Sequence, residues 1–228
     1  MSVSVSWHGH GTYSLNVDGT HIVVDPFFAG NNPAAKTSVD DVAADFILQT
    51  HGHVDHIADT VPLAKRTNAL VIANFEIHTW INNQGHTNTH PMNTGGGYDF
   101  PFGRAKLTPA LHSSGLPDGA YGGDPGGFVV WAGGKTIYFA GDTAVFSDMA
   151  LIGNLGLDLA VLPIGDNFTM GPDDALLALD YLKPKAVLPG HYNTWPLIAV
   201  DVQAWGEKVK ANTAVTPILL DVDESYTL

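Results

Sequence analysis

Three histidines and one aspartate are crowded into six positions of the stretch "LQTHGHVDHIAD", residues 48–59. Imidazole nitrogens and carboxylate oxygens are ligands that zinc and similar divalent metal ions prefer. His51 and His53 lie two residues apart, so they share one side of an extended segment. Asp55 and His56 are consecutive, so their side chains are expected to diverge from the first pair toward a second metal position. The stretch is therefore expected to serve two metal ions, but four groups cannot complete two coordination shells.

Candidates for the missing ligands occur farther along the chain, each directly after an apolar, strand-like run. His112 lies in "LTPALHSSG", Asp142 in "TIYFAGDT" and His191 in "AVLPGHYNT". Loops at strand ends are common places for functional sites. Each residue alone would more often be structural than functional, but their shared placement predicts the other half of a two-metal site. Other histidines lack this context and are expected to be structural or at the surface: His21, His78, His86 and His90.

Runs of apolar and β-branched residues predict the strands that must position these groups. Alternating segments predict strands at 3–7, 12–17 and 21–25, with a hairpin turn at Asp18-Gly19. The apolar run 44–50 is typical of a buried strand. Further strands are expected at 69–73, 128–132, 136–140, 158–164, 186–189 and 214–222. Gly133-Gly134 predicts a second hairpin, between the strands at 128–132 and 136–140.

Capping and turn residues predict where helices and loops lie. The segment 59–67 is expected to be a helix with Asp59 as its N-cap. Pro172 suits the first turn of the helix predicted over 171–184, which Pro184 should end. The other predicted helices span 74–85 and 197–211, and the predicted loops span 86–103 and 113–127. This mixture predicts two sheets with helices packed outside them, in a single domain over residues 1–228.

The composition limits the classes of partner. The chain has 228 residues, and its 23 acidic against 10 basic residues give a formal net charge of -13. Such a surface repels nucleic acid phosphates and acidic membranes, so neither is expected as a partner, whereas a small-molecule substrate is. No apolar run approaches the ~20 residues of a membrane helix, and no signal peptide is evident. We expect a cytoplasmic protein; assembly into a homo-oligomer stays open.

The ordered set H-x-H-x-D-H, a later His, G-D-T and a final G-H resembles the metallo-β-lactamase superfamily. The segments "GDTAVFSDMALI", "LPIGDNFTMGPDDA" and "KAVLPGHYNTWPLI" are similar to a widespread group of metal-dependent hydrolases within it, as is the N-terminal "WHGHGTYSLNVDGTHIVVDPFFAGN". The resemblance implies an α/β fold of the α+β kind, a four-layer αββα sandwich. It also implies that the metal ions lie at one edge, between the sheets.

The resemblance further implies roles for individual residues. The chain has no cysteine, which excludes the subclass that uses one at its second metal site. His53 stands where diiron oxygen-reducing relatives typically carry Glu, which favours hydrolysis. His10, in "GHGTYS", matches a recurrent Gly-His and is a candidate catalytic or supporting residue. The implied ligands of two divalent ions, zinc above all with manganese or iron as alternatives, are His51, His53 and His112 for one ion, Asp55, His56 and His191 for the other, and Asp142 as the bridge.

The function expected from these features is metal-dependent hydrolysis of a small ester, lactone or phosphoester. Two metal ions would activate a shared hydroxide, Asp142 would set their geometry, and Asp55 would also orient the hydroxide. A donor for the leaving group is not identified, although Tyr192, Asn193 and Asn167 lie near the motifs. One alternative is a non-catalytic or redox, diiron-like, metal-binding protein. A nuclease of the tRNA 3′-processing type is another, which the negative charge disfavours.

Overall fold

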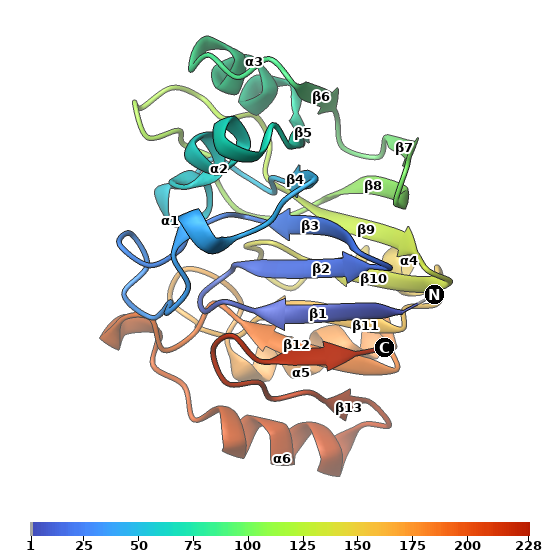
Figure 1. Cartoon of the computed structure of the whole chain (residues 1–228). Helices are drawn as coiled ribbons and strands as arrows, with labels where there is room; N and C mark the ends of the chain where they lie inside the picture. Colours follow the sequence, from blue (N-terminus) through green and yellow to red (C-terminus); the bar gives the residue numbers. More distant parts are fainter. Residues whose placement is uncertain (1) are drawn as a thin grey trace.

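Two seven-stranded sheets face each other in the computed structural model, which describes residues 2–228 (Figure 1). The first sheet has the order β14-β1-β2-β3-β4-β5-β6. Hairpin pairing joins β1, β2 and β3, and parallel pairing continues through β4, β5 and β6. Its strands are β1 (Val3–Trp7), β2 (Tyr13–Val17), β3 (Thr20–Val24), β4 (Phe46–Leu48), β5 (Leu70–Asn74), β6 (Thr89–Met92) and β14 (Ser225–Thr227).

The second sheet has the order β13-β12-β11-β10-β9-β8-β7. Each neighbouring pair from β7 through β10 is antiparallel, and each neighbouring pair from β10 through β13 is parallel. The predicted hairpin between β9 and β10 is present, with Gly133 and Gly134 at positive φ. Its strands are β7 (Gly97–Phe100), β8 (Gly103–Pro109), β9 (Gly126–Ala132), β10 (Lys135–Phe139), β11 (Leu159–Pro163), β12 (Ala186–Gly190) and β13 (Thr216–Pro217).

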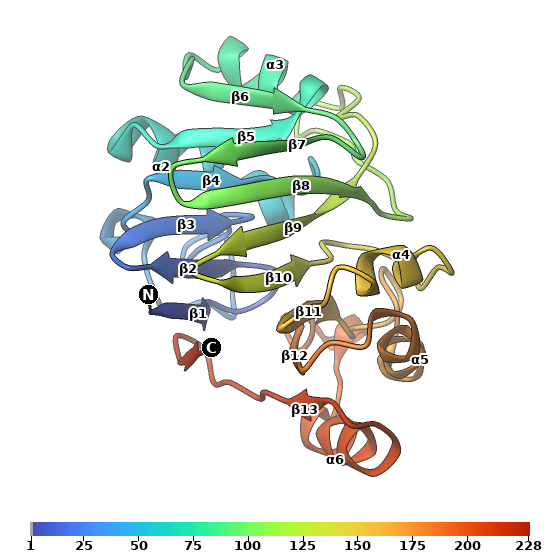
Figure 2. The ribbon, with the colours of Figure 1, turned by 90° about the vertical axis from the view of Figure 1, so that its right-hand side faces the viewer.

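Helices cover the outer faces of both sheets (Figure 2). One cluster of buried residues joins Val23, Ile47 and Val71 of the first sheet to Leu63 and Ile77 of its helices. A larger cluster fills the space between the sheets and extends to the helices of the second sheet. The expected four-layer αββα sandwich is thereby confirmed. The helices are α1 (Val54–Ile57), α2 (Thr60–Thr67), α3 (Phe75–Asn83), α4 (Met149–Gly153), α5 (Pro172–Leu182) and α6 (Val202–Asn212), with 3-10 turns at Val39–Asp41 and Pro196–Ile198.

Three local predictions were wrong. The segment 86–103 is not a loop, because it holds β6 and β7, two edge strands whose side chains are mostly exposed and so lack an apolar alternation. Asp59 does occupy the predicted N-cap position of α2, but its side chain makes no capping bond, since its carboxylate accepts hydrogen bonds from the Phe28 N–H and the Asn31 amide. The segment 214–222 contains only the short β13, and the chain continues into β14, which pairs with β1.

The strand directions explain why one edge of the sandwich collects the candidate ligands. Strands β1, β3 and β4 end at the same edge, since β1 and β3 each run antiparallel to β2 and β4 runs parallel to β3. Strands β8, β10 and β12 likewise end at one edge of the second sheet.

Among the described residues, no helix is long and apolar enough to span a membrane.

Candidate metal centre

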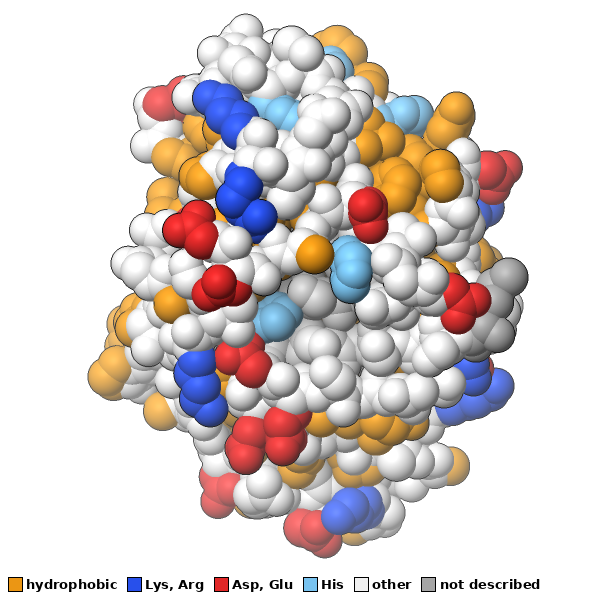
Figure 3. All heavy atoms as spheres, in the orientation of Figure 1, with side chains coloured by type: hydrophobic (Ala, Val, Ile, Leu, Met, Phe, Trp, Pro, Cys, Tyr) orange, Lys and Arg blue, Asp and Glu red, His pale blue; other side chains and the backbone are white. Residues whose placement is uncertain are grey.

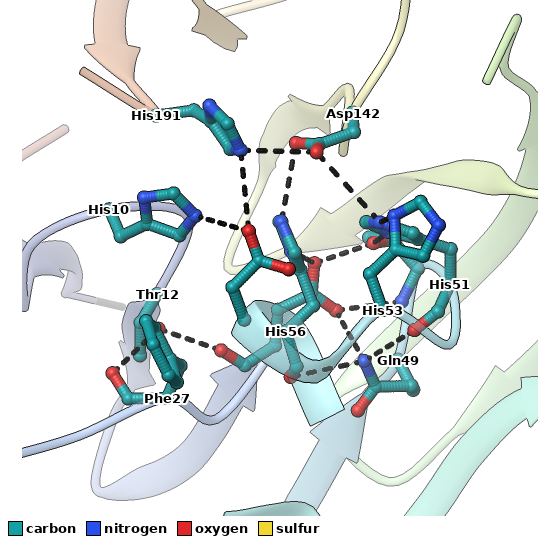
Figure 4. Close-up of polar contacts among 12 residues, drawn as sticks. His10, Thr12, Phe27, Gln49, His51, His53, His56, Asp142 and His191 are labelled. Carbon is teal, nitrogen blue, oxygen red and sulfur yellow. Dashed lines mark hydrogen bonds and ion pairs between the residues drawn. The ribbon is translucent and has the colours of Figure 1, made fainter. Parts of the chain in front are cut away.

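Every candidate ligand outside the crowded stretch follows a strand that ends at this edge, and the stretch itself follows β4. Figure 4 shows five of these side chains converging on one region, namely His51, His53, His56, Asp142 and His191. Potential ligand atoms lie within 4.8 Å of one another in one group that holds His51, His53, His112 and Asp142, and in another that holds Asp55, His56 and His191 together with His10. His51 and His56 also form such a group with Asp25. The structure thus brings together all seven predicted ligands, which are His51, His53, Asp55, His56, His112, Asp142 and His191.

The first ligand group consists of His51, His53 and His112. The Nδ1 atom of His53 lies 3.1 Å from Nε2 of His51 and 3.2 Å from Nε2 of His112. His51 is buried, whereas His53 and His112 are partly exposed. Burial lowers the pKa of all three imidazoles, which favours the neutral form that a metal ion requires.

The second ligand group consists of Asp55, His56 and His191. Asp55 and His56 belong to α1, which starts directly after His53. The His56 ring also lies next to the first group, with its centroid 4.2 Å from that of His51. The Oδ2 atom of Asp55 lies 3.8 Å from Nε2 of His191. His56 and His191 are buried, and Asp55 is partly exposed.

Asp142 faces both ligand groups from the end of β10. Its Oδ2 lies 3.5 Å from Nε2 of His112 and 3.1 Å from Nε2 of His191. Its Oδ1 lies 3.3 Å from Nε2 of His56. Burial of this carboxylate opposes its ionisation, but the neighbouring His191 and His56 outweigh that effect and hold its pKa well below the usual range. Asp142 is therefore an anion placed between two sets of imidazoles.

The hydrogen-bonding state of these atoms fits divalent metal ions. Among the described residues, the buried Nε2 of His56 and both ring nitrogens of His191 have no hydrogen-bond partner. Buried polar atoms normally have partners, so orphaned nitrogens need an explanation. A cation among them would accept their lone pairs and would also relieve the close approach of ring nitrogens in the first group. The donor set of imidazole nitrogens and carboxylate oxygens suits zinc and similar ions.

Asp25 is a supporting residue that the sequence reasoning missed. It follows β3, is fully buried, and its Oδ2 lies 2.8 Å from Nδ1 of His56. The backbone N–H of Thr50 donates to its Oδ1 at 2.7 Å. Burial raises the pKa of Asp25, and the contact with His56 offsets part of that rise. This carboxylate directs Nε2 of His56 into the site, as carboxylates bonded to the other ring nitrogen do for metal-binding histidines. Its position after "HIVVD" follows the same strand-end rule that identified Asp142.

His10 lies behind Asp55 and is completely buried. Its Nε2 lies 3.0 Å from Oδ2 of Asp55 and its Nδ1 lies 2.8 Å from the Thr194 hydroxyl. Burial lowers the pKa of His10 to about 4, so the ring is neutral at pH 7. The Nε2–H then donates to the Asp55 carboxylate, and the Thr194 hydroxyl donates to Nδ1. His10 does not line the cleft described below, and its contacts position Asp55.

Glycines beside two of the histidines are needed because other side chains pass close to the backbone. A Cβ atom on Gly11 would lie 2.6 Å from the His56 ring. A Cβ atom on Gly190 would lie 1.7 Å from the Tyr13 hydroxyl oxygen. Real Cβ atoms do not approach other atoms so closely. Gly11, the second glycine of "HGHG", and Gly190 of "PGH" are therefore required by the close packing of the site.

A cleft of about 490 Å³ opens beside the two ligand groups. Five predicted ligands line it, and Ser113 adds a hydroxyl that lies 3.2 Å from Nε2 of His53. The rest of the lining is Phe168, Trp195 and Leu197. The three residues near the motifs that were considered as leaving-group donors do not line the cleft. Tyr192 stacks on Trp7, and the side chain of Asn193 bonds to the backbone of Val200. Asn167 is exposed.

Comparison with known proteins agrees with this geometry. The family model described as a β-lactamase superfamily domain matches residues 20–192. A UPF0173 metal-dependent hydrolase of Bacillus cereus is 48% identical over 232 residues, covering 99% of this chain and 100% of the relative. One of Thermus thermophilus is 53% identical over 208 residues, covering 91% and 92%. The solved structure of Igni18, a metallo hydrolase from the archaeon Ignicoccus hospitalis, is 33% identical with a TM-score of 0.91, covering 100% and 99%. The chain therefore belongs to the metallo-β-lactamase superfamily, among its metal-dependent hydrolases.

Proposed function

We propose that this hydrolase uses two divalent metal ions, zinc above all, to cleave a small ester, lactone or phosphoester. The observation that carries the proposal is the position of Asp142, whose two oxygens face imidazoles of both ligand groups. An anion in that position offsets the repulsion between two cations held a few ångströms apart. Seven ligand residues are also too many for one tetrahedral ion.

When bound, such metal ions lower the pKa of a shared water and polarise the oxygen of the scissile group. The chain's own residues supply orientation. Asp25 fixes the ring of His56, and His10 holds Oδ2 of Asp55. The second oxygen of Asp55 has no bond to His10, so it accepts a hydrogen bond from the attacking water and orients it. The Ser113 hydroxyl, at the cleft surface, offers a hydrogen bond to the substrate.

A nuclease function has less support. Basic side chains on the face shown in Figure 3 are scattered among acidic ones and form no continuous basic patch. The formal net charge of -13 opposes binding of a polyanion.

The proposal is tested by loading the protein with zinc or manganese and measuring its metal content and its hydrolysis of lactones, phosphomonoesters, phosphodiesters and thioesters. We expect close to two ions per chain, with turnover that chelation abolishes and added metal restores. One ion or none at saturating metal would contradict the two-ion centre. A fully loaded protein that is inert toward the whole panel would support the non-catalytic alternative, and a visible absorption spectrum would distinguish a diiron centre from colourless zinc.

A further inference from the structure

One wall of the cleft beside the candidate metal centre is apolar and open to solvent. Phe168 is 52% exposed and Leu197 is 69% exposed, and the partly buried Trp195 lies with them along the cleft. Exposed apolar side chains scattered singly are common, but adjacent ones that line a cleft mark binding surfaces. The volume of about 490 Å³ falls within the range of roughly 300–1,000 Å³ that small-molecule sites occupy.

The chain holds this apolar wall in place. The loop that presents Phe168 contains two consecutive residues in the left-handed region, Asp166 at φ 61° and Asn167 at φ 53°. Asp and Asn adopt this region more readily than other non-glycine residues, and the Asn167 N–H donates to Oδ1 of Asp166 within the turn. The ring of Trp195 packs edge-on against the His10 ring, with a centroid distance of 4.8 Å. Its centroid lies 6.5 Å from that of the Phe27 ring. Packing therefore holds Trp195 in place on its part of the wall.

The polar groups of the cleft suit an uncharged substrate. None of the described residues that line it is Lys or Arg, and its carboxylates are Asp55 and Asp142. A phosphomonoester presents three charged terminal oxygens, which call for several donors beyond the metal ions, as Arg and Lys supply in phosphate sites. The cleft adds one hydroxyl, that of Ser113. The carbonyl of an ester or lactone has a single oxygen to stabilise and no charge before the reaction.

We infer that the substrate is an uncharged carboxylic ester or lactone whose apolar acyl chain lies against Phe168, Trp195 and Leu197. This inference rests on the proposed hydrolytic function. The water oxygen bonds to the acyl carbon and the acyl C–O bond breaks. Its electron pair leaves with the alcohol oxygen, which takes up a proton from the water.

Acyl chain length is the first test. Zinc-loaded protein is assayed with p-nitrophenyl acetate, butyrate and hexanoate, which share a leaving group, and with p-nitrophenyl phosphate. We expect kcat/KM to rise by roughly fourfold for each methylene that the wall covers, and to be lowest for the phosphate. Hydrolysis of the esters without dependence on chain length, or preference for the phosphate, overturns the inference and leaves the proposed hydrolase standing.

Matched variants locate the effect. Phe168→Ala should lower the hexanoate-to-acetate ratio of kcat/KM by about tenfold, because it removes one side of the apolar wall. Phe75→Ala is the control, since Phe75 is 57% exposed on α3 and outside the cleft, and it should keep the wild-type ratio. Leu197→Ser against Leu151→Ser repeats the comparison, because these leucines are 69% and 67% exposed. Equal ratios in the variants and their controls would overturn the inference.

A binding measurement tests the wall without turnover. Saturation-transfer NMR is recorded with zinc-loaded protein and 2-nonanone, a neutral ketone that resembles an ester in size and is not hydrolysed. We expect transfer to the alkyl protons that is several-fold weaker in Phe168→Ala than in Phe75→Ala. Equal transfer in the two variants removes the apolar wall as a binding surface. If transfer depends on Phe168 but no ester is cleaved, the proposed hydrolysis fails and the apolar subsite stands.

Discussion

The two ligand groups of the candidate centre differ in how firmly the rest of the chain holds them. In the first group, His53 and His112 are partly exposed. Nε2 of His53 contacts the exposed hydroxyl of Ser113. In the second group, His56 and His191 are buried, and Asp25 directs His56. Two ligands of the second group are therefore buried, against only His51 in the first, and the first group is the more open to solvent and to substrate.

This difference teaches where mutations should matter. A residue that belongs to both groups controls the whole centre, and a buried partner controls one ligand strongly because few rearrangements are available around it. A partner at the surface can be replaced by water, so its loss has a small effect. The following variants test that order.

Asp142→Asn should have the largest effect, because Asp142 faces both groups. Asn nearly keeps the shape but removes the charge that offsets repulsion between two cations. We expect the fold to persist, the second metal ion to bind much more weakly, and kcat/KM to fall by about three orders of magnitude. Metal titration and kinetics measure both effects. Wild-type stoichiometry together with wild-type turnover would remove Asp142 from the centre.

Asp25→Asn should weaken the second group most, because Asp25 contacts His56 directly and reaches His51 of the first group only through the Thr50 hydroxyl. Its amide N–H₂ would face Nδ1 of His56, so that nitrogen would have to accept and Nε2 would carry the proton, which blocks metal binding. Metal affinity should fall by roughly 10–100-fold, the usual effect of losing a group that orients a metal ligand. Isothermal titration calorimetry measures it.

The matched control for that variant is Asp59→Asn. Asp59 is also a buried carboxylate, and it accepts its two hydrogen bonds from Phe28 and Asn31, away from the ligands. This control should lower the melting temperature and leave metal affinity unchanged. If both variants weaken metal binding equally, Asp25 acts only through general stability.

Thr194→Val should have an intermediate effect. The substitution removes the hydroxyl that bonds to Nδ1 of the buried His10, so the ring that holds Asp55 is less well fixed. An unpaired buried group costs about 1–3 kcal/mol, and we expect kcat/KM to fall by roughly tenfold. Thr213→Val, at the end of α6, is the control. Turnover equal to that of the control would show that His10 has no part in positioning Asp55.

Ser113→Ala should have the smallest effect. The hydroxyl lies 3.2 Å from Nε2 of the partly exposed His53, where water can take its place. We expect metal affinity to change by less than about threefold, since exposed hydrogen bonds contribute little net stability. A loss as large as that of Asp25→Asn, measured by the same titration, would show that the two groups are equally preorganised.

The sequence alone determined much of the architecture and the list of candidate ligands. Apolar runs at 44–50, 136–140 and 186–189 marked buried strands, and polar residues directly after them were the candidates His51, Asp142 and His191. This worked because strand periodicity and the placement of loops at strand ends are local properties. The hairpins at Asp18-Gly19 and Gly133-Gly134 were likewise visible, because positive φ has a strong residue preference.

Only the tertiary structure decided how these residues are grouped and supported. The contact of Asp25 with His56 spans 31 residues, and that of His10 with Thr194 spans 184. Edge strands β6, β7 and β14 were missed because their exposed side chains carry no apolar pattern and their pairing is set by neighbours far along the chain. Periodicity records which face of a segment is buried, whereas the partner across the sandwich depends on how both sheets pack.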